Sequence, residues 1–381
     1  MSALTRRGFL EKLGAGSVAA SLPLLLPSVH AATAPYNGPK LNVALCGLGN
    51  YARMLAEGLQ ASQYCRLAGV VTGHADKAAA WQQQYQLPPQ NIYNYNNFDG
   101  IAHNPNIDVV YIVLPNFLHK PFTIRAAQAG KHVITEKPMA TTAADCEAMI
   151  AACNKAGVQL AVGYRMHFEP TQQEIMRLGQ QKAFGPVRYL EAGLGYKTYN
   201  LADANDMVDI NDDTQWRLHK TKAGGGPLMD LGVYCVQAAR YVLGEEPVAV
   251  TAQFGPVHHA QRFTQVEESI TWQMQFPGGA AANCTSSYGF NIDKLYASAD
   301  DGYFELSPAL SHGPFTGKTS AGILNIPPIN QQASQLDAMA QYIINKQPMP
   351  AHINGSEGLR DIRIIEAIYK AAQTGGVVKL V

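Results

Sequence analysis

The fold of the N-terminal half is decided by one stretch of sequence, Leu41-Asn42-Val43-Ala44-Leu45-Cys46-Gly47-Leu48-Gly49-Asn50-Tyr51-Ala52. Its first six residues form an apolar run that is typical of a strand buried on both faces. A G-x-G-x-x-A motif follows, in which the glycines allow a tight turn and close approach of a pyrophosphate, and Ala52 allows tight helix packing. The following helix N-terminus offers unpaired N–H groups to an anion. This order predicts a dinucleotide-binding Rossmann unit with its phosphate loop at Gly47, Leu48, Gly49, Asn50 and Tyr51; an ordinary turn is the alternative.

The chain continues as a regular alternation of strand and helix up to about residue 162. Apolar, β-branched runs predict strands, and segments ending at Gly130 and Gly157 carry helix stop signals. The alternation predicts a doubly wound parallel sheet with right-handed crossovers over residues 41–162. The expected strands are 41–46, 67–71, 109–113, 132–135 and 159–162, and the expected helices are 52–60, 75–85, 120–129 and 142–156.

The pattern changes over residues 163–381, where we expect a second α/β domain for substrate binding and oligomerisation. Period-two alternation separated by turn residues predicts a large, open, mostly antiparallel sheet. Gly224–Gly226 opens a helix that continues through Leu243, and a late helix over 358–372 could pack back on the Rossmann domain. The expected strands of this sheet are 187–195, 249–254, 268–276 and 280–287.

The first 32 residues are read as a twin-arginine signal peptide, followed by a Pro/Gly linker over 33–40. Thr5-Arg6-Arg7-Gly8-Phe9-Leu10 carries the twin-arginine pattern, and an apolar stretch follows from Leu13 to Leu26. A membrane anchor is the alternative, but the stretch is short and interrupted by Pro23. We therefore expect export of the folded protein to the periplasm, without stable membrane association.

The composition excludes several classes of partner. The chain has 381 residues, of which 47% are hydrophobic and 15% charged, and 29 basic residues balance 29 acidic ones. Nucleic-acid-binding proteins usually show a basic excess, so no nucleic-acid partner is expected. The six cysteines show no C-x-x-C pair and no metal-ligand spacing, so no metal site is expected.

The end of the second predicted strand favours NADP over NAD. NAD sites carry an acid there for the ribose 2′-hydroxyl, whereas this strand ends in Thr72-Gly73-His74. A hydroxyl, a backbone N–H, the His74 imidazole and the Lys77 ammonium could together bind a 2′-phosphate. An ordinary solvated helix start is the alternative.

Three further segments carry side chains suited to hydride-transfer chemistry. Lys137, in Glu136-Lys137-Pro138, follows a central strand at the edge where α/β sheets place ligands. Asp230 and Tyr234 are spaced i and i+4 on one predicted helix, and a phenol near a lysine can exchange a hydroxyl proton. Trp216-Arg217 suits stacking against a nicotinamide. Each segment has a structural alternative. Lys137 could be a surface lysine, Asp230 and Tyr234 could be an acid at a helix N-terminus and a core tyrosine, and Trp216-Arg217 could be a structural pair.

These motifs together resemble the glucose–fructose oxidoreductase/inositol dehydrogenase family over about residues 41–372. A tyrosine four residues after the aspartate resembles the glucose–fructose oxidoreductase subgroup. The segments that carry the resemblance are Val43–Gly49, Val113–Asn116, Ala129–Val133, Thr135–Ala140, Val162–Arg165, Gln215–Leu218, Gly224–Tyr234 and Gly244–Pro247. Within them, further cofactor contacts are expected from Leu114, Pro115, Asn116, His119, Glu136, Lys137, Arg165, Trp216 and Arg217.

The resemblance implies Lys137 and Tyr234 as catalytic residues, with Asp230 aiding the sugar. It implies tightly bound NADP, oxidation of an aldose to a lactone, possible return of the hydride to a second sugar, and a homodimer or homotetramer formed through the C-terminal sheet. The chain departs from the subgroup because only residues 33–40, rather than a long proline-rich arm, separate the signal from the first strand. A simple NAD(P)-dependent aldose dehydrogenase, a redox-assisted NAD-dependent glycoside hydrolase and a non-enzymatic sugar sensor are the alternatives.

Overall fold

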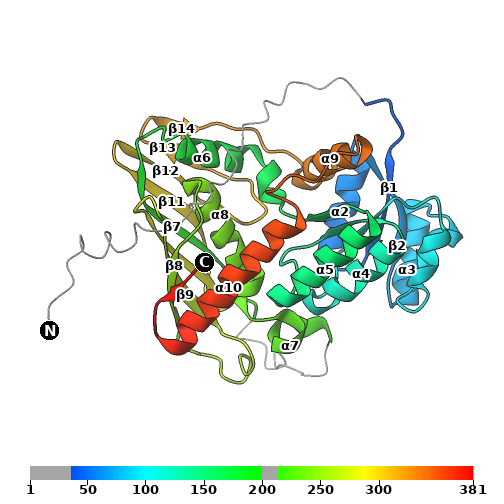
Figure 1. Cartoon of the computed structure of the whole chain (residues 1–381), viewed down its shortest axis with the longest axis horizontal. Coiled ribbons are helices and arrows are strands. Elements are labelled where there is room, and N and C mark those ends of the chain that lie inside the picture. Colours follow the sequence, from blue (N-terminus) through cyan, green and yellow to red (C-terminus); the bar gives the residue numbers. More distant parts are fainter. Residues whose placement is uncertain (1–35, 200–212, 381) are drawn as a thin grey trace.

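The computed structural model describes residues 36–199 and 213–380, so the predicted signal peptide and the first residues of the linker lie outside the described residues. Figure 1 shows a smaller sheet with its helices on one side of the molecule and a large sheet on the other. Together they confirm the expected fold class, a parallel Rossmann sheet plus a mostly antiparallel second sheet.

The Rossmann sheet has six parallel strands in the order β3-β2-β1-β4-β5-β6. The central strand β4 is buried at every position, which explains its uninterrupted apolar sequence. One helix of this domain, α5, has a side-chain cap: Thr142 accepts a hydrogen bond from the Asp145 N–H at 3.1 Å, and Gly157 ends the helix. The elements are β1 (Leu41–Cys46), α2 (Asn50–Ala61), β2 (Cys65–Val71), α3 (Ala75–Tyr85), β3 (Ile92–Tyr93), β4 (Val109–Ile112), α4 (His119–Gln128), β5 (His132–Thr135), α5 (Ala143–Ala156) and β6 (Leu160–Val162).

The second sheet has nine strands in the order β14-β13-β12-β11-β7-β10-β9-β8-β15. All neighbours pair antiparallel except β7 and β10, which are parallel. Its strands are β7 (Val187–Gly195), β8 (Ala249–Phe254), β9 (Ser269–Gln275), β10 (Ala281–Ser287), β11 (Ile292–Ala299), β12 (Gly302–Leu306), β13 (Gly317–Thr319), β14 (Gly322–Leu324) and β15 (Val378–Lys379).

Helices of the C-terminal half connect the two sheets. In α9 (Gln331–Ile344), the Asp337 carboxylate accepts hydrogen bonds from the N–H groups of Gln63 and Tyr64, each at 3.1 Å, after α2. In α10 (Gly355–Thr374), which lies between the sheets in Figure 1, Arg363 pairs with Glu147 of α5 at 2.8 Å. The other helices of this half are α6 (Pro170–Gln180), α7 (Lys220–Ala223) and α8 (Val233–Leu243).

Among the described residues, no helix is long and apolar enough to cross a membrane. No cluster of three or more His, Cys, Asp or Glu side chains in these ranges is arranged to hold a metal ion. All six cysteines are buried and free.

Candidate active site

The phosphate loop has the geometry that a dinucleotide requires. Gly47 has φ +102°, and a Cβ there would lie 2.4 Å from the Val113 carbonyl oxygen, so only glycine fits. A Cβ on Gly49 would meet nothing within 4 Å, so the space above this backbone is open. Helix α2 starts there without a side-chain cap or an acid in its first turn. The helix N-terminus is therefore free to bind a pyrophosphate.

The remaining residues of the phosphate loop differ in their exposure to solvent. Asn50 is exposed, whereas Leu48 is buried and Tyr51 has a buried hydroxyl without a hydrogen-bond partner in the described part of the chain. Leu48 and Tyr51 would therefore contact a pyrophosphate through their backbones.

The predicted 2′-phosphate pocket is only partly formed by side chains. Gly73, His74 and Lys77 are exposed after β2. Thr72 is buried, and its hydroxyl accepts a hydrogen bond from the His74 N–H at 3.3 Å. No carboxylate occupies the tip of the strand itself. The exposed imidazole, ammonium and N–H groups remain suited to a phosphate.

The loop after β4 contacts the segment predicted to be catalytic, through His119. His119 is buried, with Nε2 2.8 Å from the Leu114 carbonyl oxygen and Nδ1 3.0 Å from that of Pro138. Burial lowers the pKa of His119, although both carbonyl contacts oppose this change. Asn116 donates to the Ala223 carbonyl at 2.8 Å. These two predicted cofactor ligands connect the loop containing Pro115 to neighbouring segments, and their role toward the cofactor stays a prediction.

The three residues predicted to be catalytic lie together. Lys137 follows β5, Asp230 lies in the π-helical turn Leu228–Gly232 and Tyr234 begins α8. Lys137 Nζ donates to the Asp230 carbonyl oxygen at 2.8 Å, lies 3.7 Å from Asp230 Oδ1 and 4.6 Å from the centre of the Tyr234 ring. The turn is π-helical rather than the expected α-helix, and Lys137 contacts both side chains.

Asp230 is held as a carboxylate by its neighbours. Its Oδ2 accepts hydrogen bonds from Arg217 Nε at 3.0 Å and from the Tyr288 hydroxyl at 2.9 Å. Burial opposes the charge, but Arg217 and Lys137 outweigh it and lower the pKa of Asp230. Arg217 also lies over the Trp216 ring, 4.3 Å from its centre. Since Oδ1 accepts no hydrogen bond from these groups, it is the oxygen that can accept one from a hydroxyl.

Sequence reasoning missed Tyr288, which follows β10 in the polar segment Ser286-Ser287-Tyr288-Gly289. Its hydroxyl reaches Asp230 across 58 positions of sequence, so no local pattern indicated the contact.

Glu136 and Arg165, both predicted cofactor ligands, point into the protein. The Glu136 carboxylate accepts a hydrogen bond from Tyr111 at 2.7 Å, and burial raises its pKa to about 7. Arg165 is fully buried and donates to Gln331 Oε1 at 2.6 Å and to the Leu310 carbonyl at 3.0 Å. Their buried side chains hold the residues around the site in place through these hydrogen bonds.

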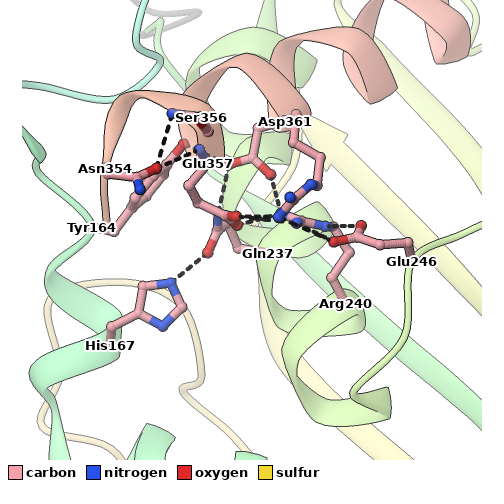
Figure 2. A network of polar contacts seen from close by, with 10 residues as sticks. Tyr164, His167, Gln237, Arg240, Glu246, Asn354, Ser356, Glu357 and Asp361 are labelled. Atoms are coloured by element: carbon pink, nitrogen blue, oxygen red, sulfur yellow. Dashed lines mark hydrogen bonds and ion pairs between the residues drawn. The ribbon is translucent and has the colours of Figure 1, made fainter. Parts of the chain in front are cut away.

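A buried polar network fixes helix α8 in place (Figure 2). Arg240 of α8 donates to Glu357 and Asp361 of α10, each at 2.6 Å. Asp361 also accepts hydrogen bonds from Gln237 and from Tyr164 of the Rossmann side, each at 2.6 Å. Because Gln237 lies one turn after Tyr234, this network positions the tyrosine relative to both domains.

A hollow of about 540 Å³ lies elsewhere, on the face of the large sheet formed by β7–β10. Polar side chains line it, including Glu191, Thr251, Gln273 and Asn283. None of the predicted site residues lines this hollow.

Comparison with known proteins gives matches over both domains. Residues 41–164 match the oxidoreductase family with an NAD-binding Rossmann fold, and residues 172–304 match the GFO/IDH/MocA C-terminal domain. The crystal structure of aldose-aldose oxidoreductase from Caulobacter crescentus, complexed with glycerol, is 43% identical, with a TM-score of 0.83, and the match covers 90% of this chain and 100% of that one.

Two curated relatives also match most of the chain. D-xylose 1-dehydrogenase [NADP(+)] of Haloarcula marismortui is 28% identical over 351 residues, covering 88% of this chain and 92% of that protein. D-xylose 1-dehydrogenase (NADP(+)) 2 of Haloferax volcanii is 26% identical over 332 residues, covering 84% and 94% respectively.

Proposed function

The chain belongs to the GFO/IDH/MocA oxidoreductase family, and we propose that it is an NADP-dependent sugar oxidoreductase that oxidises an aldose to a lactone. The observation that carries this proposal is the contact of Lys137 with both Asp230 and Tyr234. Similarity to an aldose-aldose oxidoreductase and to two D-xylose dehydrogenases supports a sugar as the substrate.

Each side chain has a distinct task in this proposal. The nicotinamide, when bound, accepts or returns the hydride of the sugar. Tyr234 takes the proton of the reacting hydroxyl when the sugar is oxidised and returns it when a sugar is reduced. Lys137 holds its ammonium beside the Tyr234 ring, where it can stabilise charge that develops during the proton transfer, and Asp230 Oδ1 accepts a hydrogen bond from a sugar hydroxyl.

NADP rather than NAD is supported by two observations. No acid of the kind typical of NAD sites ends β2; exposed His74 follows the strand and exposed Lys77 lies in the first turn of α3. Both D-xylose dehydrogenases that match the chain are named as NADP(+) enzymes. Acid release of the nucleotide from purified protein, followed by mass measurement, tests this assignment, and NAD in place of NADP would contradict it.

The cofactor could cycle between two sugars, as in the glucose–fructose oxidoreductase subgroup. An aldose should raise the fluorescence of reduced nicotinamide in the purified protein, and a second sugar, added after the first is removed, should lower it again. If no second sugar lowers the signal and further turnover requires exchange of the bound NADPH for free NADP, the protein is a simple aldose dehydrogenase.

We also propose that the protein acts in the periplasm after twin-arginine export, on the pattern around Arg6-Arg7. Replacing both arginines by lysine should trap the protein in the cytoplasm with its leader attached. Unchanged periplasmic recovery would contradict this location.

We further propose a homodimer or homotetramer formed through the outer face of the large sheet. This face carries the polar hollow, which is lined by strands β7, β10, β9 and β8. An arginine at Thr271 or Gln273 should break such an assembly without touching the active site. Light scattering would measure the mass, and a monomeric parent protein would contradict the proposal.

A further inference from the structure

Arg165 is a fully buried cation whose hydrogen-bond partners are all neutral. It lies in a short 3₁₀ helix, Arg165–Phe168, directly after β6. Its NH1 group contacts Gln331 Oε1 at 2.6 Å and Met166 Sδ at 3.1 Å, and its NH2 group donates to the Leu310 carbonyl at 3.0 Å. Within the described ranges, Arg165 forms no ion pair with a carboxylate.

A second buried arginine shows how unusual this is. Arg240 is also fully buried, but it pairs with Glu246, Glu357 and Asp361 at 2.6–2.7 Å. Burying a guanidinium without a counter-ion is costly, since the lost hydration is only partly replaced by neutral acceptors. Arg165 has no direct ion pair of this kind, and the buried Glu136 is a carboxyl group that acts on its charge. Its guanidinium can therefore still act on a further neighbouring group.

The neighbouring group is Tyr234. The Arg165 guanidinium carbon lies 5.0 Å from the centre of the Tyr234 ring, and Lys137 Nζ lies 4.6 Å from the same centre. Burial disfavours the Arg165 charge, but interactions with Tyr234 and Tyr51 outweigh it and raise the pKa of Arg165. Arg165 therefore stays cationic beside the tyrosine at any pH where the protein is folded.

The other titratable groups that act on this tyrosine lie on four elements. Lys137 follows β5, Tyr51 lies in α2, Tyr196 follows β7 and Asp230 precedes Tyr234 on its own helix. Asp230 is already paired with Arg217 at 3.0 Å and lies 3.7 Å from Lys137. Since Lys137 shares its charge with Asp230, Arg165 is the cation beside Tyr234 that forms no direct ion pair with a carboxylate in the described residues, although the buried Glu136 acts on its charge.

We propose that Arg165 is a positioning residue of the active site, which holds Tyr234 in place and stabilises the negative charge on its oxygen while the proton is away. The inference rests on the proposed function. When a sugar carbonyl is reduced, the O–H bond of Tyr234 breaks and an O–H bond forms on the sugar, leaving a phenolate beside Lys137 and Arg165. When a sugar is oxidised, its hydroxyl proton returns to that phenolate. Arg165 keeps its own protons throughout.

The neutral partners of Arg165 provide an isosteric test. Gln331→Glu places a carboxylate at the position of the Gln331 amide and offsets the charge of Arg165 without removing it. Because the new carboxylate pairs with the buried Arg165, the variant should be at least as stable as the parent. Turnover should nevertheless fall roughly 10²-fold, the usual effect of removing one preorganised group that stabilises developing charge.

The experiment compares Gln331→Glu, Arg165→Met, Arg165→Lys and the packing control Met149→Leu, a buried methionine of α5, each with and without Tyr234→Phe. Gln331→Glu and Arg165→Met should lower kcat and leave the aldose KM unchanged. Arg165→Lys should lose much less turnover than Arg165→Met, and Met149→Leu should match the parent. In the Tyr234→Phe background the same changes should have no further effect, because their action passes through the hydroxyl. Losses of equal size in both backgrounds, or a Gln331→Glu protein with the parental kcat, would overturn the proposal.

A second readout needs no sugar. The ultraviolet tyrosinate signal that Tyr234→Phe removes should appear at higher pH in Arg165→Met and Gln331→Glu than in the parent. If none of the aldoses tested reduces the bound nucleotide of the parent, the proposed function fails. The tyrosinate signal still decides the inference in that case. An unchanged position of the signal would refute the role of Arg165 while leaving the proposed function intact.

Discussion

The Lys137 ammonium lies 4.6 Å from the centre of the Tyr234 ring, although the two residues belong to different domains. Lys137 follows strand β5 of the Rossmann sheet, and Tyr234 lies in α8 under the large sheet. The site therefore exists only when the domains are packed together, and the Arg240 network that fixes α8 contributes to it indirectly.

Lys137→Met should lower turnover strongly, because the cation beside Tyr234 and its hydrogen bond to the Asp230 carbonyl are both lost. The double variant Lys137→Met/Tyr234→Phe should be little slower than the slower single variant, since both residues serve one proton transfer. Steady-state kinetics measure this, with Lys120→Met as a control for loss of a lysine paired at the surface. If the fold-losses in turnover of the two single variants multiply in the double variant, the two residues act independently.

Asp230→Asn should raise the aldose KM roughly 10–10²-fold, the loss of one charged hydrogen bond. The substitution should also alter the acid stability. The folded pKa of Asp230 is lowered, so its carboxylate contributes stability above the unfolded pKa of about 4 that is lost as the pH falls through the folded value. Thermal unfolding between pH 3 and pH 6 (roughly the range of carboxyl titration) should therefore depend less on pH in the variant, and parallel curves would contradict this.

The sequence predicted strand β1 and the phosphate loop, because both are encoded by residues that lie next to one another in the chain. The apolar run of β1 and the glycines at Gly47 and Gly49 act through neighbouring residues, so pattern and motif were sufficient there. The contact of Lys137 with Asp230 joins residues 93 positions apart, and only the family resemblance indicated it.

Other features were hidden by their polar sequences. Helix α9, which the sequence pattern did not predict, begins with buried glutamines, Gln331, Gln332 and Gln335, instead of an apolar pattern. The partners of Gln331 and Gln335 lie in distant parts of the chain. The direction of the Arg165 and Glu136 side chains likewise depends on packing between distant segments, so the sequence could not distinguish a cofactor ligand from a buried support.

Glu136→Gln should remove a pH dependence of stability near neutrality. Burial raises the folded pKa of Glu136 from 4.5 to about 7, so in this window the folded protein holds a proton that the unfolded chain has released. Stability should therefore fall as the pH rises from about 4.5 to about 7 in the parent. Chemical denaturation across this range should show a flatter profile in Glu136→Gln, and identical slopes would refute the assignment.

Arg240→Met should destabilise the protein by about 3–5 kcal/mol, because Glu357 and Asp361 would be left buried without their cation. Arg188→Met is the matched control, since the Arg188–Asp300 pair is exposed to solvent and should contribute little to stability. Urea denaturation of both variants measures the difference. Equal effects would show that the buried network does not hold α8.

The central claim, that Tyr234 transfers the proton of a sugar hydroxyl, is tested most directly by one single-turnover measurement. Protein loaded with NADP is mixed with an aldose, and the appearance of reduced nicotinamide is followed in the parent and in Tyr234→Phe. The phenylalanine keeps the ring between Lys137 and Arg165, so the nucleotide content should not change. The account predicts a rate roughly 10²–10⁴-fold lower in the variant, the usual effect of losing a general acid or base. A Tyr234→Phe protein that reduces its cofactor at the parental rate would contradict the account and leave the tyrosine with a packing role alone.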